Sequence, residues 1–286
     1  MRFTEDFKDY ELIDANGGER LERWGNIFLI RPDPQAMWNL PFNKKDWQKA
    51  DAVYHRSNSG GGTWEVLKKV PDVWQIDYKG LKFNLKPMGF KHTGLFPEQA
   101  VNWDLMSDLI KKANRPVKVL NLFAYTGGAT LACLKAGASV THVDASKGMV
   151  AWAKENAKAS GLDGHPVRWL VDDCLKFVQR EIRRGNKYDG IVMDPPSYGR
   201  GPNGEVWKLE NNLAELLELV SGILSDEPVF FLLNSYTAGM SQTVLNFLVK
   251  EIIGKGRRGN VSTEEIGLKV TNRNLILPAG NTTIWK

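Results

Sequence analysis

The residue pattern best suited to chemistry follows an apolar strand in the second half of the chain. Ile191-Val192-Met193 runs directly into Asp194-Pro195-Pro196-Ser197-Tyr198. Proline lacks an N–H group and restricts the residue before it, so two prolines end the strand sharply and fix a rigid loop. Such a loop can orient an attacking amine with its carbonyl groups and the Asp194 carboxylate, while the Tyr198 ring stacks on a planar group. The alternative is an ordinary turn with an aspartate cap.

A second pattern is a glycine turn after the strand expected at 118–122. The turn reads Phe123-Ala124-Tyr125-Thr126-Gly127-Gly128, and Asn121 lies near the end of the strand. Glycine lets backbone approach a ligand without a Cβ and adopt positive φ, although ordinary strand-to-helix connections use it too. A dinucleotide dehydrogenase would show G-x-G-x-x-G, which seats a pyrophosphate on the helix N-terminus. Adjacent glycines lack that spacing and favour S-adenosylmethionine, which carries no phosphate.

Carboxylates follow the next two expected strands. Asp144 ends the strand at 139–144, where a carboxylate reaches ribose hydroxyls in this class of sheet, although it could instead cap the helix that follows. Asp172-Asp173-Cys174 follows the strand at 167–171 and could accept from an adenine amino group and donate a backbone N–H to a ring nitrogen. Three consecutive strand ends would then face one nucleoside.

The elements that position these residues alternate along the chain from about residue 100. Apolar runs of five or six residues between helical stretches are typical of strands buried on both faces with crossover helices. Strands are expected at 118–122, 139–144, 167–171, 190–194 and 229–234, helices at 130–136, 148–160, 174–184, 211–224 and 239–253, and a closing hairpin at 275–285 around Pro278-Ala279-Gly280. Right-handed crossovers would build a doubly wound, mostly parallel α/β sheet whose ligands bind outside the carboxyl ends of the strands.

Residues 1–85 differ in composition from the rest of the chain. They are rich in tryptophan, tyrosine, glycine and proline, with short candidate strands at 26–30 and 64–70. The segment 57–62 is expected to be a turn or a mobile hairpin tip. This pattern predicts that residues 1–85 form a small β-rich region with an accessory or substrate-recognition role. Residues 86–286 are predicted to form the cofactor-binding domain.

Composition narrows the class of protein further. The two cysteines, Cys133 and Cys174, lack the spacing of a metal site or a disulfide framework, so we expect no metal and a reducing, cytoplasmic location. The N-terminus lacks the features of a secretory signal, and no window holds 18 uninterrupted apolar residues. The net charge of +5 is modest. The basic run Arg180, Arg183, Arg184 and Lys187 could meet phosphates, or could be a solvated helix end.

On these motifs, the chain from about Phe90 onward resembles the S-adenosylmethionine-dependent ribosomal large-subunit RNA methyltransferase family, which includes cytosine-C5 and guanine-N7 enzymes. The residues that carry the resemblance are 91–99, 121–127, 143–146, 172–173 and 194–198. The resemblance implies a seven-stranded, Rossmann-like class I methyltransferase sheet and S-adenosylmethionine as the cofactor.

The resemblance also implies roles for individual residues. The catalytic candidates, which border the methyl group and the target, are Asp194, Pro195, Pro196, Ser197 and Tyr198. The cofactor candidates form a cap (His92, Thr93, Phe96, Gln99), line the amino-acid and sulfonium portion (Asn121, Phe123, Ala124, Tyr125, Thr126, Gly127), bind the ribose (Asp144, Ala145, Ser146), bind the adenine (Asp172, Asp173, Cys174) and reach the methyl group (Asp194).

Two features depart from the family pattern. A cytosine-C5 enzyme attacks its base with a thiolate, but the family's cysteine positions read Pro196-Ser197-Tyr198 and Asn234-Ser235-Tyr236 here. Cys133 lies on a probable core helix and Cys174 beside the adenine site, so a base nitrogen is favoured as the methyl acceptor. The N-terminal region also does not resemble the RNA-binding PUA module of some members, although its aromatic residues could stack on unpaired bases.

The expected substrate and partner is ribosomal or other structured RNA, and the oligomeric state is open between a monomer and a homodimer. Two alternatives remain: a methyltransferase of a small molecule or a protein side chain, and a non-catalytic, cofactor-binding RNA interaction module.

Overall fold

The computed structural model describes residues 1–57, 61–200, 206–237 and 239–286, and the chain forms two compact units. Unit 1 contains Met1, residues 101–266 and residues 280–286, and unit 2 contains residues 2–100 and 267–279. Two strands, β15 (Val261–Val270) and β16 (Leu275–Trp285), contribute residues to both units.

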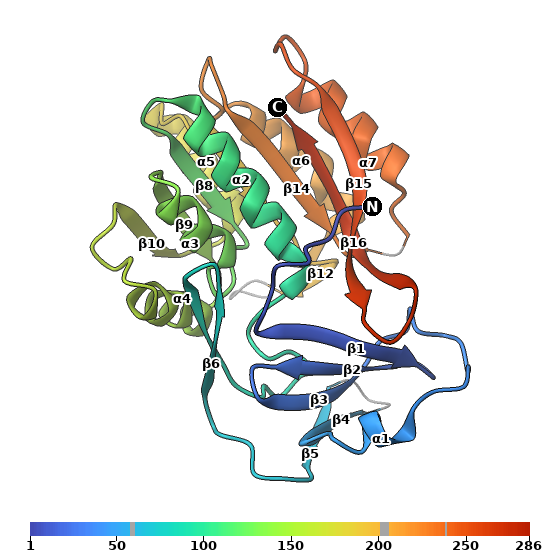
Figure 1. The fold of residues 1–286 in the computed structure, drawn as a ribbon. Helices are drawn as coiled ribbons and strands as arrows, with labels where there is room; N and C mark the ends of the chain where they lie inside the picture. Colours follow the sequence, from blue (N-terminus) through green and yellow to red (C-terminus); the bar gives the residue numbers. More distant parts are fainter. Residues whose placement is uncertain (58–60, 201–205, 238) are drawn as a thin grey trace. The chain divides into compact units, whose positions relative to one another are not determined.

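Unit 1 is built around a mostly parallel sheet (Figure 1). Its other strands are β8 (Lys118–Leu122), β9 (Ser139–Asp144), β10 (Val167–Val171), β11 (Gly190–Met193) and β14 (Phe230–Ser235). They are hydrogen-bonded in the order β10-β9-β8-β11-β14-β16-β15. All neighbours from β10 to β14 are parallel, and β16 is antiparallel to β14. The chain therefore reverses its direction of travel through the sheet between β8 and β11, the position at which doubly wound sheets bind ligands.

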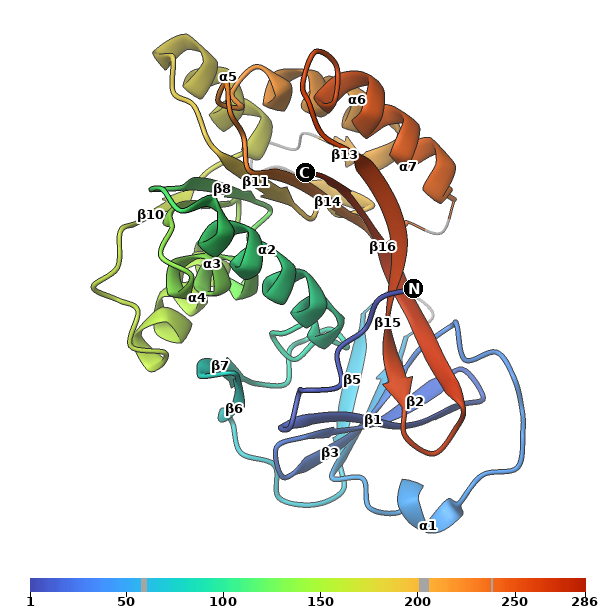
Figure 2. The same ribbon diagram turned by 45° about the horizontal axis from the view of Figure 1, so that its top comes forward.

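Helices cover both faces of this sheet, with α2, α3 and α4 on one side and α5, α6 and α7 on the other (Figure 2). Their bounds are α2 (Ala100–Ala113), α3 (Gly128–Lys135), α4 (Lys147–Ala159), α5 (Cys174–Arg184), α6 (Leu209–Ser221) and α7 (Gln242–Leu248), which continues as the π-helical turn η2 (Val249–Ile253). A short hairpin of β12 (Tyr198–Arg200) and β13 (Val206–Lys208) precedes α6.

The strands of unit 1 have continuous apolar sequences because the core buries their side chains on both faces of the sheet. Leu120, Val143, Ile191 and Phe231 are each fully buried between the sheet and the helices over it. Burying one such side chain stabilises a fold by about 1.5–3 kcal/mol. The strand ends that carry the polar motifs are thereby held on a rigid support.

Unit 2 is β-rich (Figure 1). Its elements are β1 (Tyr10–Asn16), β2 (Glu19–Trp24), β3 (Ile27–Pro32), α1 (Lys44–Trp47), β4 (Ala52–Arg56), β5 (Gly62–Val66), the hairpin of β6 (Trp74–Tyr78) and β7 (Leu81–Leu85), and the 3₁₀ turn η1 (Pro97–Gln99). A small apolar cluster of Ile13, Leu21, Ile30 and Ala50 forms part of its core. The turn predicted at 57–62 connects the antiparallel strands β4 and β5, and residues 58–60 of it lie outside the described part of the chain.

The doubly wound α/β fold predicted from the sequence is confirmed, with two corrections. Seven strands of the large sheet contribute to unit 1, but the hydrogen-bonded order continues from β15 to β1 and reaches 12 strands, so the predicted strand number is incomplete. The closing hairpin is misplaced in the prediction. Pro278-Ala279-Gly280 lies inside the single strand β16, and the reversal occurs between β15 and β16. Proline is tolerated within a strand where its missing N–H is not needed for pairing.

Candidate active site

The turn after β8 has an unusual backbone. Phe123 and Tyr125 have φ angles of 55° and 49°, and Gly127 has a φ of 89°. Non-glycine residues with positive φ cost roughly 1–3 kcal/mol each and cluster at functional sites. Gly127 and Gly128 are required for different reasons, because Gly127 is left-handed while a Cβ on Gly128 would lie 2.6 Å from Cζ2 of Trp103.

Three strand ends meet at this turn. The Asp144 carboxylate at the end of β9 accepts the Tyr125 N–H through Oδ2 (2.8 Å) and the Ser146 N–H through Oδ1 (2.8 Å). Beyond β10, the Asp172 N–H donates to the Asp144 carbonyl (3.0 Å). The Phe123 N–H donates to Sγ of Cys174 (3.3 Å). Hydrogen bonds thus hold the three tips together, and their joint contact with one nucleoside stays a prediction.

Asp144 does not cap the helix that follows it. Ser146 is the N-cap of α4, and its side chain accepts the Met149 N–H. Burial raises the pKa of Asp144 above its ordinary value, while the amides of Ser146 and Tyr125 oppose the rise. The carboxylate is therefore a half-buried acceptor that is oriented by two backbone amides and not by a cation.

The carboxylates after β10 also have structural partners. Asp173 is the N-cap of α5, where Oδ1 accepts the Lys176 N–H (2.8 Å), and Asp172 forms an ion pair with Arg180. The family resemblance implies that Asp173 binds the adenine, but helix capping already occupies one of its two carboxylate oxygens.

The remaining candidates in this turn are placed by buried contacts. Asn121 is buried, and its Nδ2 donates to Oγ1 of Thr130 on α3 (2.9 Å), which is in turn 2.9 Å from Nδ1 of His142. The Thr126 carbonyl accepts from Nδ2 of Asn156 on α4 (3.0 Å). The Ala124 N–H donates to the Val143 carbonyl (3.1 Å), while Ala145 is exposed. Asn121 thus supports the turn from within the core.

The Asp-Pro-Pro loop leaves β11 next to these tips, because β11 pairs with β8. Pro195 is buried and Pro196 exposed, and Trp207 Nε1 donates to the Pro196 carbonyl (2.7 Å). The Ser197 hydroxyl lies 2.6 Å from the Thr237 hydroxyl. Tyr198 is 51% exposed at the start of β12. The loop is therefore held by side chains on both sides, as a rigid orienting loop requires.

Asp194 is the first member of a chain of hydrogen bonds through the core of unit 1. Its Oδ1 accepts from Nδ2 of Asn234 on β14 (3.2 Å). Oγ1 of Thr282 on β16 donates to Oδ1 of Asn234 (2.9 Å) and accepts from Nδ2 of Asn102 on α2 (2.9 Å). Asn234, Thr282 and Asn102 are each 1% exposed. We call these three residues and Asp194 the Asp194 relay.

Sequence reasoning missed the relay and Trp207. Asn234 follows the rule that found Asp144, since it is a polar residue near the carboxyl end of a buried strand. The Trp207 ring packs against Phe123, with centroids 5.4 Å apart. No motif marks Trp207, and only the folded β12–β13 hairpin brings it to the Asp-Pro-Pro loop.

The predicted cap residues belong to unit 2. The His92 and Phe96 rings pack edge to face (5.1 Å), the Gln99 N–H donates to the Phe96 carbonyl (3.1 Å), and Thr93 is fully buried. Burial, and then the Arg31 charge, lower the pKa of His92 to about 4. Their role as a cap over the cofactor stays a prediction.

Buried charges anchor this segment inside unit 2. Arg31 donates to both oxygens of Glu22 (2.6 and 2.8 Å) and to the Lys91 carbonyl (2.9 Å). Burial would raise the pKa of Glu22, but Arg20 and Arg31 hold it at about 2. The segment that carries His92 is therefore tied to β2 and β3.

Neither cysteine is placed to act as a nucleophile. Cys133 is completely buried, and burial raises its pKa to about 12. Burial also raises the pKa of Cys174, whose exposed fraction is 4%. Thiol reactivity requires an accessible thiolate. The geometry therefore supports the prediction that catalysis does not use a cysteine.

The donors and acceptors at the strand ends suit an adenosyl sulfonium. Asp144 and Asp173 offer carboxylate oxygens for hydroxyl and amino groups, and the left-handed Gly127 opens the backbone. The turn after β8 does not carry the G-x-G-x-x-G spacing of a phosphate cradle. Parallel strand order, crossover helices and carboxylates at successive strand ends define the unit as a nucleoside-binding, doubly wound α/β enzyme.

Comparison with known proteins identifies the family. The family described as S-adenosylmethionine-dependent methyltransferase matches residues 49–225. This match covers more than half of the 286 residues, so the chain belongs to the S-adenosylmethionine-dependent methyltransferase family. Its cofactor is S-adenosylmethionine, and it is a methyl-transferring enzyme.

Individual relatives agree with this assignment. The ribosomal RNA large subunit methyltransferase K/L of Shewanella frigidimarina is 37% identical over 148 residues, which are 51% of this chain and 20% of that protein. The protein of the same name from Pseudoalteromonas atlantica is 34% identical over 160 residues, which are 55% of this chain and 22% of that protein. The chain thus spans about a fifth of the length of these curated relatives.

Solved structures share the fold. The crystal structure of a SAM-dependent methyltransferase from Agrobacterium tumefaciens has a TM-score of 0.93 and 37% identity, with coverage of 99% of this chain and 92% of that one. A structure assigned to a methyltransferase from Streptococcus mutans has a TM-score of 0.76 at 19% identity, covers 99% of this chain and 76% of that one, and shows the fold alone. Among the described helices, none combines the length and apolar character that crossing a bilayer requires.

Proposed function

We propose that this enzyme methylates a base nitrogen in structured RNA, with ribosomal RNA as the substrate class. Two observations carry the choice of nitrogen: the Asp194 carboxylate is held by the relay, and both thiols are buried. A nitrogen acceptor needs a positioned lone pair and no covalent attack, whereas a cytosine-C5 acceptor needs an accessible thiolate. The site supplies a fixed carboxylate and lacks an exposed cysteine among the described residues.

The proposed roles follow the contacts. Bound S-adenosylmethionine supplies an electrophilic methyl group on a sulfonium. Asp144 binds the ribose, and Phe123 to Gly127 enclose the amino-acid portion. Asp194 orients the acceptor amine together with the carbonyl groups of the proline loop, which the bond from Trp207 to the Pro196 carbonyl holds in place. Tyr198 stacks on the target base.

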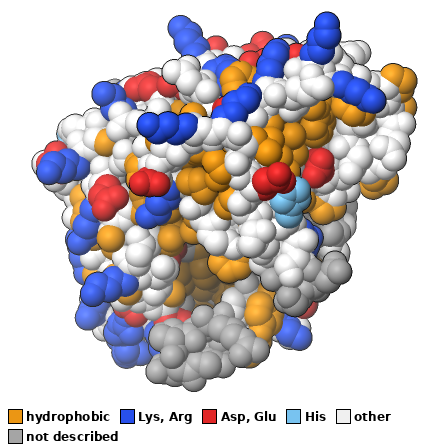
Figure 3. Space-filling view, turned by 90° about the horizontal axis from the view of Figure 1, so that it is seen from below, with side chains coloured by type: hydrophobic (Ala, Val, Ile, Leu, Met, Phe, Trp, Pro, Cys, Tyr) orange, Lys and Arg blue, Asp and Glu red, His pale blue; other side chains and the backbone are white. Residues whose placement is uncertain are grey.

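RNA as the substrate is supported by the relatives named as ribosomal RNA methyltransferases and by the surface of unit 2. Met37, Leu40 and Phe42 are 81%, 52% and 42% exposed, so this segment presents apolar side chains to solvent. Figure 3 shows one face of the molecule, where hydrophobic side chains gather between Lys and Arg side chains that lie mainly along its upper and left edges. Apolar contacts flanked by cations suit unpaired bases and phosphates.

The division of roles along the chain is part of the proposal. Residues 1–85 would recognise the substrate, residues 86–286 would bind the cofactor, and residues 92–99 would cap it. A ribosomal RNA substrate also implies the cytoplasmic location expected from the sequence.

Transfer of a labelled methyl group to total RNA would test the proposal. We expect purified enzyme to label ribosomal RNA, and nucleoside mass spectrometry to locate the label on a base nitrogen. The Asp194→Ala variant, with wild-type cofactor affinity, is the control for a contaminating activity. Label on cytosine C5 would overturn the choice of nitrogen. Label only on protein or small molecules would support the alternative substrate class, and cofactor binding without transfer to any of these would support the non-catalytic alternative.

A further inference from the structure

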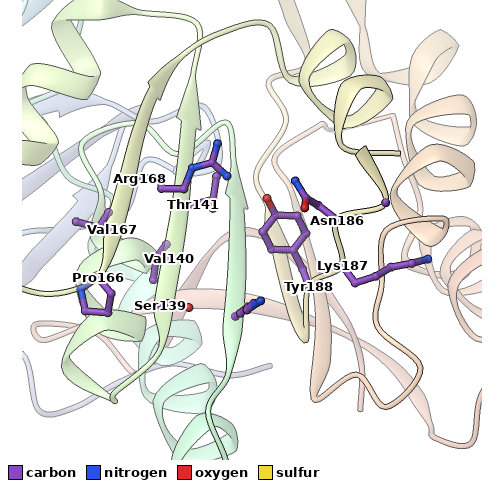
Figure 4. A pocket seen from close by; sticks show the side chains of 11 residues that line it. Ser139, Val140, Thr141, Pro166, Val167, Arg168, Asn186, Lys187 and Tyr188 are labelled. Carbon is purple, nitrogen blue, oxygen red and sulfur yellow. The ribbon is translucent and has the colours of Figure 1, made fainter. Parts of the chain in front are cut away.

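A polar cleft of about 670 Å³ lies in unit 1 at the amino ends of the parallel strands. Arg168 and Thr141, from β10 and β9, lie on one side of it, and Asn186 and Tyr188, which lead into β11, lie on the other (Figure 4). Strands rise about 3.3 Å per residue, so the cleft is roughly 15 Å from the strand ends that carry the candidate active site. It is therefore a separate site from the methyl-transfer site.

The helix over this face of the sheet ends above the cleft. α5 stops at Arg184, and its C-cap Gly185 has a φ of 68°. The residues that follow α5, Gly185, Asn186 and Lys187, line the cleft and lead toward β11. The end of α5 therefore forms part of the cleft wall.

The charge of the cleft is positive. Lys118, Arg168 and Lys187 are among its eleven described lining residues, and none of the eleven is acidic. Lys187 Nζ donates to the Gly222 carbonyl (2.7 Å) and points away from the other two. In the part of the chain that the structure describes, the exposed Lys118 and Arg168 side chains form no ion pair or hydrogen bond. Two cations are thus available to a ligand.

Strand register fixes these cations beside two hydroxyl groups. Lys118 pairs directly with Ser139 across β8 and β9, and Arg168 pairs with Thr141 across β9 and β10. Residues opposite each other on neighbouring strands point to the same face of the sheet. A rigid arrangement of ammonium, guanidinium and hydroxyl donors is suited to phosphate oxygens.

Two carboxylates next to the cleft have partners of their own. Asp189 accepts the Lys118 backbone N–H (2.9 Å) and pairs with Arg115 (3.0 Å). Glu181 on α5 is completely buried and accepts from Tyr188 Oη (2.7 Å), Asn186 Nδ2 (2.8 Å) and Arg184 Nη1 (3.0 Å). The same bonds explain part of the basic run that the sequence shows at 180–187. Arg180 and Arg184 pair with acidic residues of unit 1, whereas Lys118 and Arg168 form no ion pair among the described residues and Arg168 acts on Glu181 only as a nearby charge.

The cleft provides no surface for a nucleobase. Tyr188 is its one aromatic lining residue, is 5% exposed and has its hydroxyl bonded to Glu181. Recognition of a base in a nucleotide pocket or single-strand groove commonly uses stacking on an exposed ring. The ligand chemistry is therefore that of a backbone phosphate and not of a base.

We propose that this cleft binds a backbone phosphate of the RNA substrate at a distance from the methylated base. This inference rests on the proposed function, and it makes the amino ends of the strands a second contact with the same RNA. Contacts of this kind position a nucleic acid without reading its sequence.

The test compares two double variants that each remove two exposed lysine or arginine charges. Lys118→Ala with Arg168→Ala empties the cleft of its free cations, and Lys111→Ala with Lys112→Ala on α2 is the matched control. Fluorescence anisotropy measures binding of a ribosomal RNA fragment over a range of salt concentrations. We expect the cleft variant to bind about 10-fold more weakly and its salt slope to fall by roughly one to two. Calorimetry should show unchanged S-adenosylmethionine affinity.

A second measurement separates this proposal from the proposed function. A short oligouridylate, which presents phosphates whatever the enzyme methylates, is titrated into labelled enzyme while amide resonances of Gly185, Asn186 and Lys187 are followed by NMR. Shifts of these amides without methylation of any RNA would support the cleft and reject RNA methylation. Methylation of RNA with unmoved amides, or equal losses of affinity in the cleft variant and its control, would overturn the cleft alone. If the amides do not shift and no RNA is methylated, the cleft proposal and the proposed function are both overturned.

Discussion

At the residue scale, Asp144 is the carboxylate whose surroundings best match a ribose ligand. Two backbone amides orient it, and burial raises its pKa. We expect Asp144→Ala to weaken S-adenosylmethionine binding at least 10-fold, which corresponds to about 1.4 kcal/mol. Isothermal titration calorimetry would measure the change. Asp163→Ala, at an exposed loop position, is the matched control, and equal cofactor affinity in Asp144→Ala and wild type would remove the ribose assignment.

Asp194 should behave differently, because its proposed ligand is the acceptor. We expect Asp194→Ala to slow single-turnover methylation about 100-fold, since loss of orientation costs rates of that order. Its dissociation constant for S-adenosylmethionine should stay within about threefold of the wild-type value. If cofactor affinity falls as much as the rate, Asp194 belongs to the cofactor site instead.

A residue can be assigned to the candidate site from the sequence only where the neighbouring sequence determines its position in the fold. Asp144 and Asp194 were found because each ends an apolar strand, and a parallel sheet brings such ends together. Trp207 has no local signal, since the β12–β13 hairpin determines its position. Capping of α5 by Asp173 was likewise hidden, because an aspartate before a helix reads equally well as a cap or as a ligand.

At the scale of elements, the Asp194 relay joins one helix and two strands to the Asp-Pro-Pro loop. Thr282→Val removes the hydroxyl that serves both Asn102 and Asn234. Loss of these two buried hydrogen bonds should lower the free energy of unfolding by about 1–3 kcal/mol. Because Asn234 then loses its anchor, single-turnover methylation should slow while cofactor affinity is kept.

Thr282→Ser keeps the hydroxyl and is the matched control. Recovery of the rate in this variant, measured beside thermal stability, separates positioning of Asp194 from general damage to the fold. A normal rate in Thr282→Val would show that the relay is structural only.

Helices and strands with a strong apolar pattern were predicted well. Strands that form because a neighbouring strand pairs with them were not. β8, β9, β10 and α5 have the predicted bounds. β15 reads Val-Ser-Thr-Glu-Glu-Ile-Gly-Leu-Lys-Val, whose mixed polarity hides a strand until its partner is known. The proline and glycine inside β16 suggested a turn for the same reason.

At the scale of the whole molecule, buried histidine links stability to pH. Burial, and then the Lys154 charge, lower the pKa of His142 to about 3, against an ordinary value of 6.5. The unfolded chain binds this proton as pH falls through 6.5, but the folded protein does not until about pH 3. The contribution of His142 to stability is therefore complete above the pKa of the unfolded chain, 6.5. It declines as pH falls from 6.5 toward the folded pKa of about 3.

When pH is lowered from 7 to 5, the free energy of unfolding should fall, and we expect His142 to account for about 2 kcal/mol of that decrease. His92, with its pKa lowered to about 4, acts in the same direction. Urea unfolding at both pH values should show a smaller loss in His142→Gln than in wild type or in the surface variant His165→Gln. The same pH dependence in all three proteins would contradict this account.

The discontinuity of unit 2 limits how this enzyme can be dissected. Its β1 strand is bonded to the chain after residue 266, and the Asp14 carboxylate, 2.6 Å from Arg273 Nε, is nearly inaccessible. An expression fragment that stops near residue 85 or 100 would expose an unsatisfied strand edge and a lone buried charge, both of which promote aggregation or unfolding. Swapping unit 2 between relatives therefore requires grafting two stretches of chain at once, and a simple exchange of the N-terminal residues would fail.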